Sequence, residues 1–562
     1  MRVLFVYPNL YTQMGFNHGL ASLSASLLQA GHETRLINLN ENLGEVPSDE
    51  QVLDELLEWG AGVIAFSCLS QQYAQALRLA RELRRLAAET ERTLPPLIVG
   101  GIHPTMVPDQ VMRDGVWDLV GVGECEDALV SLVTSLERGE HRDDHANFLC
   151  WEGGVRPLEL DEDGAMADGH TFKTNPVGEF PNLAELPFPD YALFDTQAIL
   201  DGKQGWAGLL TSRGCPYRCT YCLNHRIVDR YKADLGRSTA AIGFFRFRRP
   251  EDVIEEMRLV VKSYSGVGTF ILDDDLFTQN VEHAIEICAA YEASELDLPL
   301  VVNSHVKRLD PRVAEALGAA GCRILKLGIE SGSRRVRYEV LKRPMSDADI
   351  LETVEFSEAS GLHTSGFVML GLPTETREER FETVDILARS GIGRFRTSLF
   401  YPFPGTESHR LAIEGGFVND EEIGSLTDFT SSSCLDFGEA ENLFISKLAA
   451  CMPWYVNARM DRFREAPAAA RYRPLVERVE AMNREEWEAF QPSLREVDRE
   501  YSEAASRAGE VHYAIRYNAF MGVRSDFFLA EESGTEWMTA AAKPVPDRLR
   551  ALALAAAADE RA

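Results

Sequence analysis

The sequence lacks an apolar run that approaches the roughly 20 residues of a membrane-spanning helix, so we expect no membrane span. Residues 1–8 are too short an apolar region for a signal peptide and are predicted to form a first strand. Without a secretory signal, the ten cysteines favour a reducing, cytoplasmic location, where thiols bind metals. Positive charge is scarce, and a net charge of −31 argues against nucleic acid as a partner, because phosphate binding needs clustered Lys and Arg.

The length and composition allow several packed domains. The chain has 562 residues, of which 45% are apolar. Its first 140 residues alternate between short apolar strands and helical patterns. The strands are expected at 3–7, 34–39, 63–67, 97–99 and 119–122. This α/β alternation predicts a doubly wound, Rossmann-like parallel sheet with its ligand at the carboxyl ends of the strands.

The loops after these strands are therefore the expected ligand-facing segments. They cover residues 9–17, 67–72, 100–105 and 123–126, and their glycines let the backbone approach a large ligand closely. The first loop lacks the G-x-G-x-x-G pattern that a dinucleotide site needs. The residues alone therefore predict a ligand-binding domain whose ligand is not a dinucleotide.

Three cysteines form the most specific pattern in the chain. Cys215, Cys219 and Cys222 have the spacing C-x3-C-x2-C directly after an apolar run. Three thiolates on one short loop can hold three irons of a [4Fe-4S] cluster and leave the fourth iron open for chemistry. Zinc is the alternative, with His225 as a fourth ligand, although structural zinc sites usually contain two separated cysteine pairs.

The rest of the chain is predicted to contain a linker, a barrel and a helical domain. Residues 141–205 are rich in loops and proline and suit a strap between domains, with a short hairpin before residue 170. Residues 206–425 alternate strands and helices again, which indicates a partial (β/α)6 barrel with its site at the carboxyl ends of the strands. Residues 426–562 are predicted to be mainly helical and substrate-related. The expected barrel strands lie at 207–211, 269–272, 300–303, 324–328, 366–370 and 396–401.

These motifs resemble one enzyme family. The three cysteines, with Tyr221 before the last, resemble the signature of the radical S-adenosylmethionine superfamily. The Gly-Gly-x-His-Pro-Thr segment at 100–105 and the Gly-Glu-x-Glu segment at 123–126 are similar to the cobalamin-binding domain of its cobalamin-dependent members. No D-x-H-x-x-G motif is present, so the resemblance implies a cobalamin without histidine on cobalt, whose lower face is lined by residues 67–72.

The resemblance also implies where each cofactor binds. The three cysteines would ligate the cluster. Asp273 and Asp275 would contact the amino group of S-adenosylmethionine, or else act as helix caps. The full set implied for S-adenosylmethionine is Tyr221, Asp273, Asp275, Asn303, Glu330, Ser331, Gly366 and Gly371. The set implied for cobalamin is Asn9, Gln13, Ser67, Ser70, Gly101, His103, Pro104, Gly123 and Glu124.

The activity implied is methyl transfer to an unactivated carbon of a small-molecule or peptide intermediate. In this family a 5′-deoxyadenosyl radical removes a hydrogen atom and methylcobalamin supplies the methyl group, with electrons from an external flavodoxin or ferredoxin. Two alternatives are kept open. One is a cobalamin-dependent radical cyclase or rearrangement enzyme, and the other is a non-catalytic, zinc-stapled binding scaffold.

Overall fold

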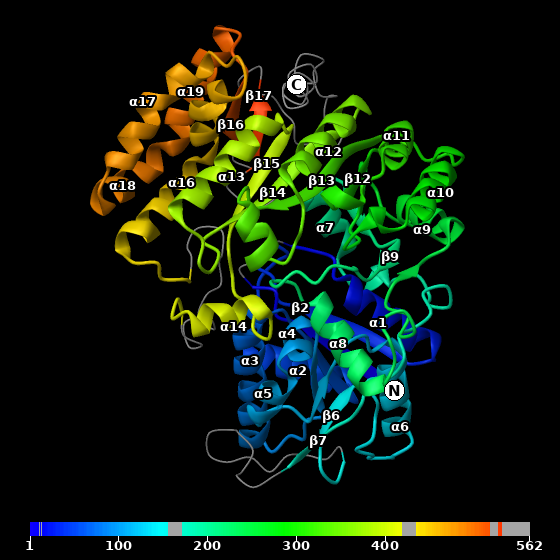
Figure 1. Cartoon of the computed structure of the whole chain (residues 1–562). Helices are drawn as coiled ribbons and strands as arrows, with labels where there is room; N and C mark the ends of the chain where they lie inside the picture. Colours follow the sequence, from blue (N-terminus) through cyan, green and yellow to red (C-terminus); the bar gives the residue numbers. More distant parts are fainter. Residues whose placement is uncertain (11, 13, 155–170, 419–433, 517–525, 531–562) are drawn as a thin grey trace.

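The computed structural model describes residues 1–562 except 11, 13, 155–170, 419–433, 517–525 and 531–562. An N-terminal α/β domain lies against a central barrel, and a helical region packs on the far side of that barrel (Figure 1). Among the described residues, no helix is long and apolar enough to cross a bilayer.

The N-terminal domain is the predicted parallel sheet, with strand order β2-β1-β3-β4-β5-β6-β7. The order changes direction between β1 and β3, which in such folds marks the ligand-binding edge. Its strands are β1 (Arg2–Tyr7), β2 (Glu33–Asn38), β3 (Val63–Ser67), β4 (Leu97–Gly100), β5 (Leu119–Gly121), β6 (Phe148–Trp151) and β7 (Phe172–Thr174). Its helices are α1 (His18–Gln29), α2 (Asp49–Trp59), α3 (Ser70–Glu89), α4 (Ile102–Met106), α5 (Pro108–Arg113) and α6 (Glu126–Glu137).

Neighbouring residues cap both ends of α2. Before α2, the Ser48 side chain accepts from the Gln51 N–H, and Gln51 in turn accepts from the Ser48 N–H, which forms a capping box. The helix ends at Gly60, which has the left-handed backbone conformation that glycine adopts without strain. Helices α2, α3 and α5 then bury one face of the sheet, and α1 and α6 bury the other.

The segment 141–205, expected to be a linker, contributes to the first domain. Its hairpin strands β6 and β7 pair antiparallel and extend the sheet beyond β5. The proline-punctuated part continues into α7 (Thr196–Gly202), and Phe194 and Ile199 join the core beneath α1 and α6. The strap is therefore packed structure, because its apolar residues are buried in the core of the first domain.

The barrel has all six predicted parallel strands, in the order β15-β14-β13-β12-β11-β8. These are β8 (Trp206–Leu209), β11 (Thr269–Leu272), β12 (Leu300–Ser304), β13 (Cys322–Glu330), β14 (His363–Leu370) and β15 (Arg394–Leu399). A short hairpin of β9 (Ser212–Arg213) and β10 (Arg246–Phe247) stands beside them. The helices are α8 (Asn224–Leu235), α9 (Pro250–Ser263), α10 (Val281–Glu292), α11 (Pro311–Ala319), α12 (Asp347–Ala359), α13 (Arg377–Ser390) and α14 (Glu407–Glu414).

The C-terminal region is helical, as predicted, but it also extends the barrel sheet. Strand β17 (Asp526–Ala530) pairs antiparallel with β15 and with β16 (His512–Arg516). The helices are α16 (Glu439–Arg459), α17 (Ala468–Ala481), α18 (Arg484–Phe490) and α19 (Leu494–Arg507). The end of the predicted helical region, residues 531–562, lies outside the described residues.

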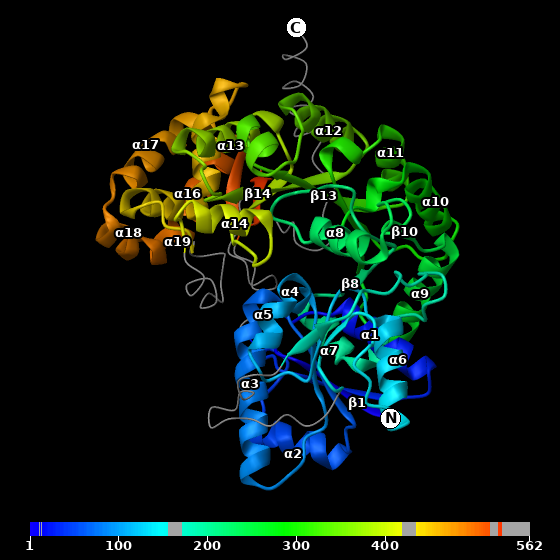
Figure 2. The same ribbon diagram turned by 60° about the horizontal axis from the view of Figure 1, so that its bottom comes forward.

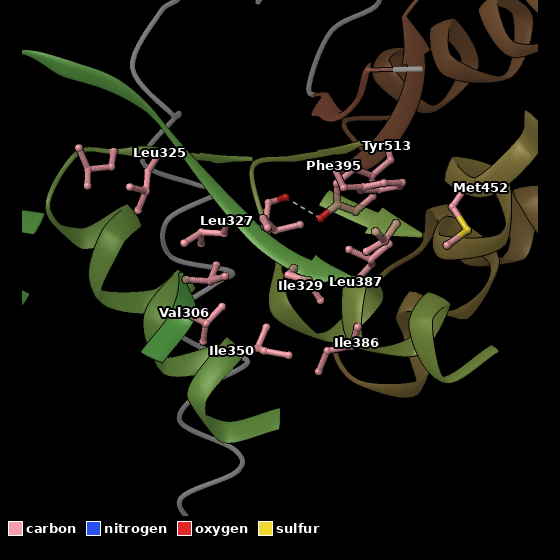
Figure 3. Close-up of a cluster of buried hydrophobic side chains, with 14 of the residues drawn as sticks. Val306, Leu325, Leu327, Ile329, Ile350, Ile386, Leu387, Phe395, Met452 and Tyr513 are labelled. Carbon is pink, nitrogen blue, oxygen red and sulfur yellow. Dashed lines mark hydrogen bonds between the residues drawn. The ribbon is translucent and has the colours of Figure 1, made fainter. Parts of the chain in front are cut away.

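One continuous core joins the barrel to the C-terminal helices. Along β13, Leu327 and Ile329 are buried against helices, while the alternating residues Lys326 and Glu330 are half-buried on the other face of the strand. Figure 3 shows the helix side of β13, with Ile350 from α12 and residues of α13 and α16 meeting the strand. This core is rigid and large, so it can hold the strand ends in fixed positions.

Candidate functional site

The cysteine loop lies between β9 and α8, where the two domains meet (Figures 1 and 2). Cys219 is buried, and Cys215 and Cys222 are half-buried. Burial raises the pKa of Cys215 to about 11 and that of Cys222 to about 12. Protonated thiols cannot ligate metal, so this environment requires a cation to stabilise the thiolates, which a bound metal provides.

Hydrogen bonds pin the cysteine loop to the end of the barrel. The Thr220 N–H donates to the Leu341 carbonyl at 3.1 Å, and its hydroxyl donates to the Val340 carbonyl at 2.7 Å. The Cys222 N–H donates to the Cys219 carbonyl at 3.1 Å, which closes a tight turn between two of the thiols. The loop is therefore shaped before any metal binds.

The zinc alternative requires His225 to join the three thiols around one ion. In the part of the chain that the structure describes, no group of three His, Cys, Asp or Glu side chains is placed to hold a single metal ion. His225 lies at the start of α8, where burial lowers its pKa and its Nδ1 is buried without a hydrogen-bond partner. The iron-sulfur interpretation rests instead on the compact cysteine triplet, whose three thiolates can bind three irons of one cluster.

The three consecutive aspartates after β11 divide between two roles. Asp274 is fully buried and accepts from the N–H groups of Thr211 at 2.7 Å and Ser212 at 2.8 Å, which fastens the start of the cysteine segment to β11. Asp273 and Asp275, the two predicted S-adenosylmethionine residues, line a cavity on the opposite side. The alternative role of this cluster as helix caps is wrong, because the side chain that caps α10 is that of Asn280, which accepts from the His283 N–H.

Asp273 faces the N-terminal domain across that cavity. Its Oδ2 is 3.9 Å from Nε2 of His18, at the start of α1. Burial acts to raise the pKa of Asp273, but His18 and the positive charge of Lys326 outweigh it and lower the pKa overall. Gly208 leaves room for this approach, because a Cβ there would lie 2.6 Å from Oδ2 of Asp273. Neither His18 nor Gly208 was among the expected site residues.

A second cluster of polar side chains lies at the end of β13. The Tyr221 hydroxyl donates to Oε1 of Glu330 at 3.0 Å, and Arg343 lies 3.8 Å from the same oxygen. Arg343 also donates to Sγ of Cys219 at 3.6 Å, so it connects the cysteine loop with the expected ribose-binding carboxylate. Glu330 has a positive φ of 65°, a strained conformation that is often found at functional sites. Arg343 was missed because it follows no strand and matches no motif.

Other residues expected to bind S-adenosylmethionine have structural partners. The Ser331 hydroxyl is fully buried, accepts from the Ser333 N–H at 3.2 Å and contacts Thr383. A Cβ on Gly366 would lie 2.7 Å from Ile392 and 2.9 Å from Ile329, so this glycine leaves room for two core side chains. The Gly371 N–H donates to buried Glu375 at 2.9 Å. Asn303 is half-buried, and its amide donates to the Asp274 carbonyl at 3.1 Å.

The residues expected to bind cobalamin gather at the carboxyl edge of the first sheet. Ser67, Gly101, Gly123 and Glu124 line the same cavity as Asp273. Gly101 has a φ of 97°, and a Cβ there would lie 2.7 Å from the Cys68 carbonyl, so only glycine fits. This edge therefore combines an open backbone with the aspartates of the barrel.

Four more expected residues lie around that edge. His103 contacts Ser70 at 3.2 Å and stacks on Tyr73, and burial lowers its pKa to about 4. Pro104 is buried beside it within α4. Asn9 is buried and accepts from the Gln72 amide at 2.9 Å. The remaining expected residue, Gln13, lies outside the described residues.

The cavity has a volume of about 360 Å³ and is formed by both domains. Phe5, Ala65, Ile98 and Phe148 give it an apolar wall on the sheet, and α1 and α6 cover it. Gly100, Gly101, Gly121 and Gly123 leave its edge without side chains. An apolar channel below an open glycine edge fits a large flat ring with an apolar base, and the carboxylates opposite fit a cationic cofactor.

Known proteins combine these same two domains. Residues 11–133 match the B12 binding domain, and residues 209–387 match the radical SAM superfamily. This combination defines a class of enzymes that use cobalamin together with the cofactors of the radical SAM domain. The chain belongs to the cobalamin-dependent radical S-adenosylmethionine enzymes, with a [4Fe-4S] cluster, S-adenosylmethionine and cobalamin as its cofactors.

Two relatives illustrate the similarity. An uncharacterised methyltransferase of Pyrococcus horikoshii is 26% identical over 71% of this chain and 79% of its own. The anaerobic magnesium-protoporphyrin IX monomethyl ester cyclase of Rubrivivax gelatinosus is 22% identical over 78% of this chain and 75% of its own.

Two solved structures share the fold. The cobalamin-dependent radical enzyme OxsB, with aqua-cobalamin bound, has a TM-score of 0.59 at 16% identity, over 90% of this chain and 73% of its own. The methyltransferase TsrM of Kitasatospora setae has a TM-score of 0.55 at 19% identity, over 74% of this chain and 76% of its own.

Proposed function

We propose that this enzyme transfers a methyl group to an unactivated carbon of a small-molecule or peptide intermediate. The observation that carries the proposal is the shared cavity, in which the glycine edge of the B12-binding domain faces the aspartates beside the cysteine loop. A cobalamin at that edge and an S-adenosylmethionine at those aspartates would bind on opposite walls of one enclosed space. The methyltransferase among the relatives supports the same reaction type.

Each group of residues has a distinct task in this proposal. Cys215, Cys219 and Cys222 would hold the cluster, and Asp273 and Asp275 would bind the cationic amino group of S-adenosylmethionine. When bound, the cofactors supply a carbon-centred radical and a methyl group.

The protein's own contribution is position and exclusion of water. Tyr221, Glu330 and Arg343 hold one another in place beside the cysteine loop, so the carboxylate is oriented before the cofactor arrives. The apolar wall formed by Phe5, Phe66 and Phe148 keeps the cavity poor in water, which protects a radical from quenching.

The same proposal includes an external reductant and a cytoplasmic location. A flavodoxin or ferredoxin would supply single electrons to the cluster. The described residues include all ten cysteines, and none of these forms a disulfide, which fits a reducing compartment.

The test is anaerobic purification followed by metal and corrinoid analysis, and then incubation of candidate substrates with methyl-labelled S-adenosylmethionine. We expect ~4 Fe and one corrinoid per chain, and label in the product. Bound cofactors without label in any product would contradict methyl transfer.

A second reaction type is favoured by one observation. The Rubrivivax gelatinosus cyclase is similar over most of both chains. In a cyclase, cobalamin would assist ring closure and no methyl group would reach the product. An unlabelled product with a new ring, formed together with 5′-deoxyadenosine, would support this alternative.

A further inference from the structure

Two arginines of the barrel domain form ion pairs with one loop of the B12-binding domain, residues 123–126. Arg213 donates from Nη1 to Oε2 of Glu124 at 2.5 Å and to Oε1 of Glu126 at 2.7 Å. Arg246, its neighbour on the β9–β10 hairpin, donates to the same Oε2 of Glu124 at 3.0 Å and to the Pro181 carbonyl at 3.0 Å. Both carboxylate oxygens of Glu124 are thus engaged by protein groups, so its expected contact with cobalamin stays a prediction for its backbone alone.

The same loop has an anchor on α8. The Glu124 N–H donates to the Tyr231 hydroxyl at 3.1 Å, and Asn147 donates to that hydroxyl at 3.3 Å. A Cβ on Gly123 would lie 2.5 Å from the Tyr231 hydroxyl, so the glycine permits this contact. Phe180 stacks on the Tyr231 ring, with centroids 3.8 Å apart, and places its other side near Arg246.

The cysteine loop lies between these anchors in the sequence. Arg213 lies two residues before Cys215, and Tyr231 follows Cys222 on α8. The loop at 123–126, to which both are attached, includes Gly123 and lines the cavity. The segment that holds the cluster is therefore attached on both sides to the segment that faces cobalamin.

The charges in this contact are balanced. Glu124 and Glu126 oppose Arg213 and Arg246, and all four side chains are at most about one fifth exposed, the largest value being 21%. Burial acts to raise the pKa of Glu124, but the two arginines outweigh it and lower the pKa overall. Glu124 therefore stays ionised, and the contact acts as a strong, oriented link.

We propose that Glu124, Glu126, Arg213 and Arg246 form an interdomain latch that sets the distance between the cluster and cobalamin. The four are positioning residues, since they contact each other and not the reacting atoms. This inference rests on the proposed function, because a fixed distance matters only when both cofactors act on one substrate. A displacement of 1 Å can lower a rate by about 100-fold.

The test compares three variants of the full-length protein, reconstituted anaerobically with iron, sulfide and cobalamin. Glu124→Gln removes the shared carboxylate. Glu124→Gln with Arg246→Gln restores charge balance without restoring the link. Glu179→Gln is the matched control, because it removes an exposed ion pair to Arg237, at 2.9 Å.

Two measurements separate positioning from folding. Electron paramagnetic resonance reports the magnetic interaction between the reduced cluster and cob(II)alamin, which depends on their separation. Chemical assays report cleavage of S-adenosylmethionine to 5′-deoxyadenosine and, separately, methylation of cobalamin by S-adenosylmethionine. Iron and cobalt contents show whether each variant holds both cofactors.

We expect both Glu124 variants to retain iron, cobalt and cleavage to 5′-deoxyadenosine, while the magnetic interaction changes and methylation of cobalamin falls about 100-fold. The Glu179→Gln control should behave like the wild type. An unchanged magnetic interaction in the Glu124 variants would overturn the latch, as would full recovery in the charge-balanced double variant. If the wild type itself fails to methylate cobalamin, the proposed function fails, and the magnetic measurement still decides the latch.

Discussion

Arg343 provides the sharpest test of how the cofactor-binding residues are held together. Its guanidinium is 8% exposed and lies 3.8 Å from Oε1 of Glu330, 3.5 Å from the Tyr221 hydroxyl and 3.1 Å from the Gly328 carbonyl. Arg343→Met removes the cation and leaves the Glu330 carboxylate buried. Breaking a buried ion pair from one side costs far more than the intact pair contributes.

The size of the effect follows from two limits. At an effective dielectric constant near 20, charges 4 Å apart interact by about 4 kcal/mol. Glu330 can instead take up a proton, and relative to its ordinary pKa of 4.5 this limits the loss at pH 7 to about 3 kcal/mol. We therefore expect Arg343→Met to lower the free energy of unfolding by up to about 3 kcal/mol at pH 7.

The sign of the pH dependence can also be derived. Burial already raises the pKa of Glu330, and Arg343 opposes that rise. Without Arg343 the pKa of Glu330 rises further in the folded state. The contribution of protonated Glu330 to the stability of the variant is therefore fully present below about pH 4.5, and it is lost as the pH rises through the folded-state pKa. The deficit of the variant relative to the wild type should therefore grow from pH 5.5 toward neutrality and then level off.

Calorimetry of the apoprotein between pH 5.5 and 8.5 measures this deficit. Arg343→Met with Glu330→Gln should recover most of the loss, since no unpaired carboxylate remains. Arg410→Met is the control, because it breaks only an exposed ion pair with Glu414, and exposed pairs contribute little to stability. A deficit that is independent of pH, or a double variant no more stable than the single, would refute the reasoning.

Three further predictions follow from the same geometry. Replacing the three loop cysteines with alanine should abolish iron binding, whereas Cys322→Ala, in the buried core, should leave ~4 Fe per chain. Iron that survives the triple substitution would disprove the ligand assignment. Gly101→Ala should lower the melting temperature by several degrees, because of its φ of 97° and the contact with Cys68, while Gly100→Ala, whose Cβ meets nothing within 4 Å, should not. Burial raises the pKa of Asp274 to about 6, so the free energy of unfolding of the wild type should fall as the pH rises from 4 through 6. Asp274→Asn should flatten this pH dependence, and equal pH profiles of the two proteins would contradict the prediction.

The sequence alone sufficed where the structure depends on local pattern. The strands at 63–67 and 269–272 follow from short apolar runs, and both occur as predicted. The cysteine spacing predicts the cluster loop from local pattern too, since all three expected ligands lie within eight consecutive residues.

Contacts between residues far apart in the chain could not be predicted from local pattern. Glu124 was expected beside cobalamin from a resemblance, and its partners Arg213 and Arg246 lie 89 and 122 residues away. The strands β16 and β17 were missed because β17 pairs antiparallel with the last barrel strand, whereas the predicted strands came from a parallel strand-helix alternation. The close approach of Gly366 to Ile392, between α13 and β15, was not foreseen for the same reason.

The site belongs to the interface between the domains and not to either domain alone. Phe16, just before α1, stacks on Tyr191 of the strap with ring centroids 4.7 Å apart, and Ser24 of α1 donates to Asp190 at 2.6 Å. These contacts hold the start of α1, and with it His18, across the cavity from Asp273. Because the strap packs into the core of the first domain, a cut within 141–205 would expose apolar surface and open the cavity. Separated halves should therefore retain their secondary structure and still lack the arrangement on which a two-cofactor reaction depends.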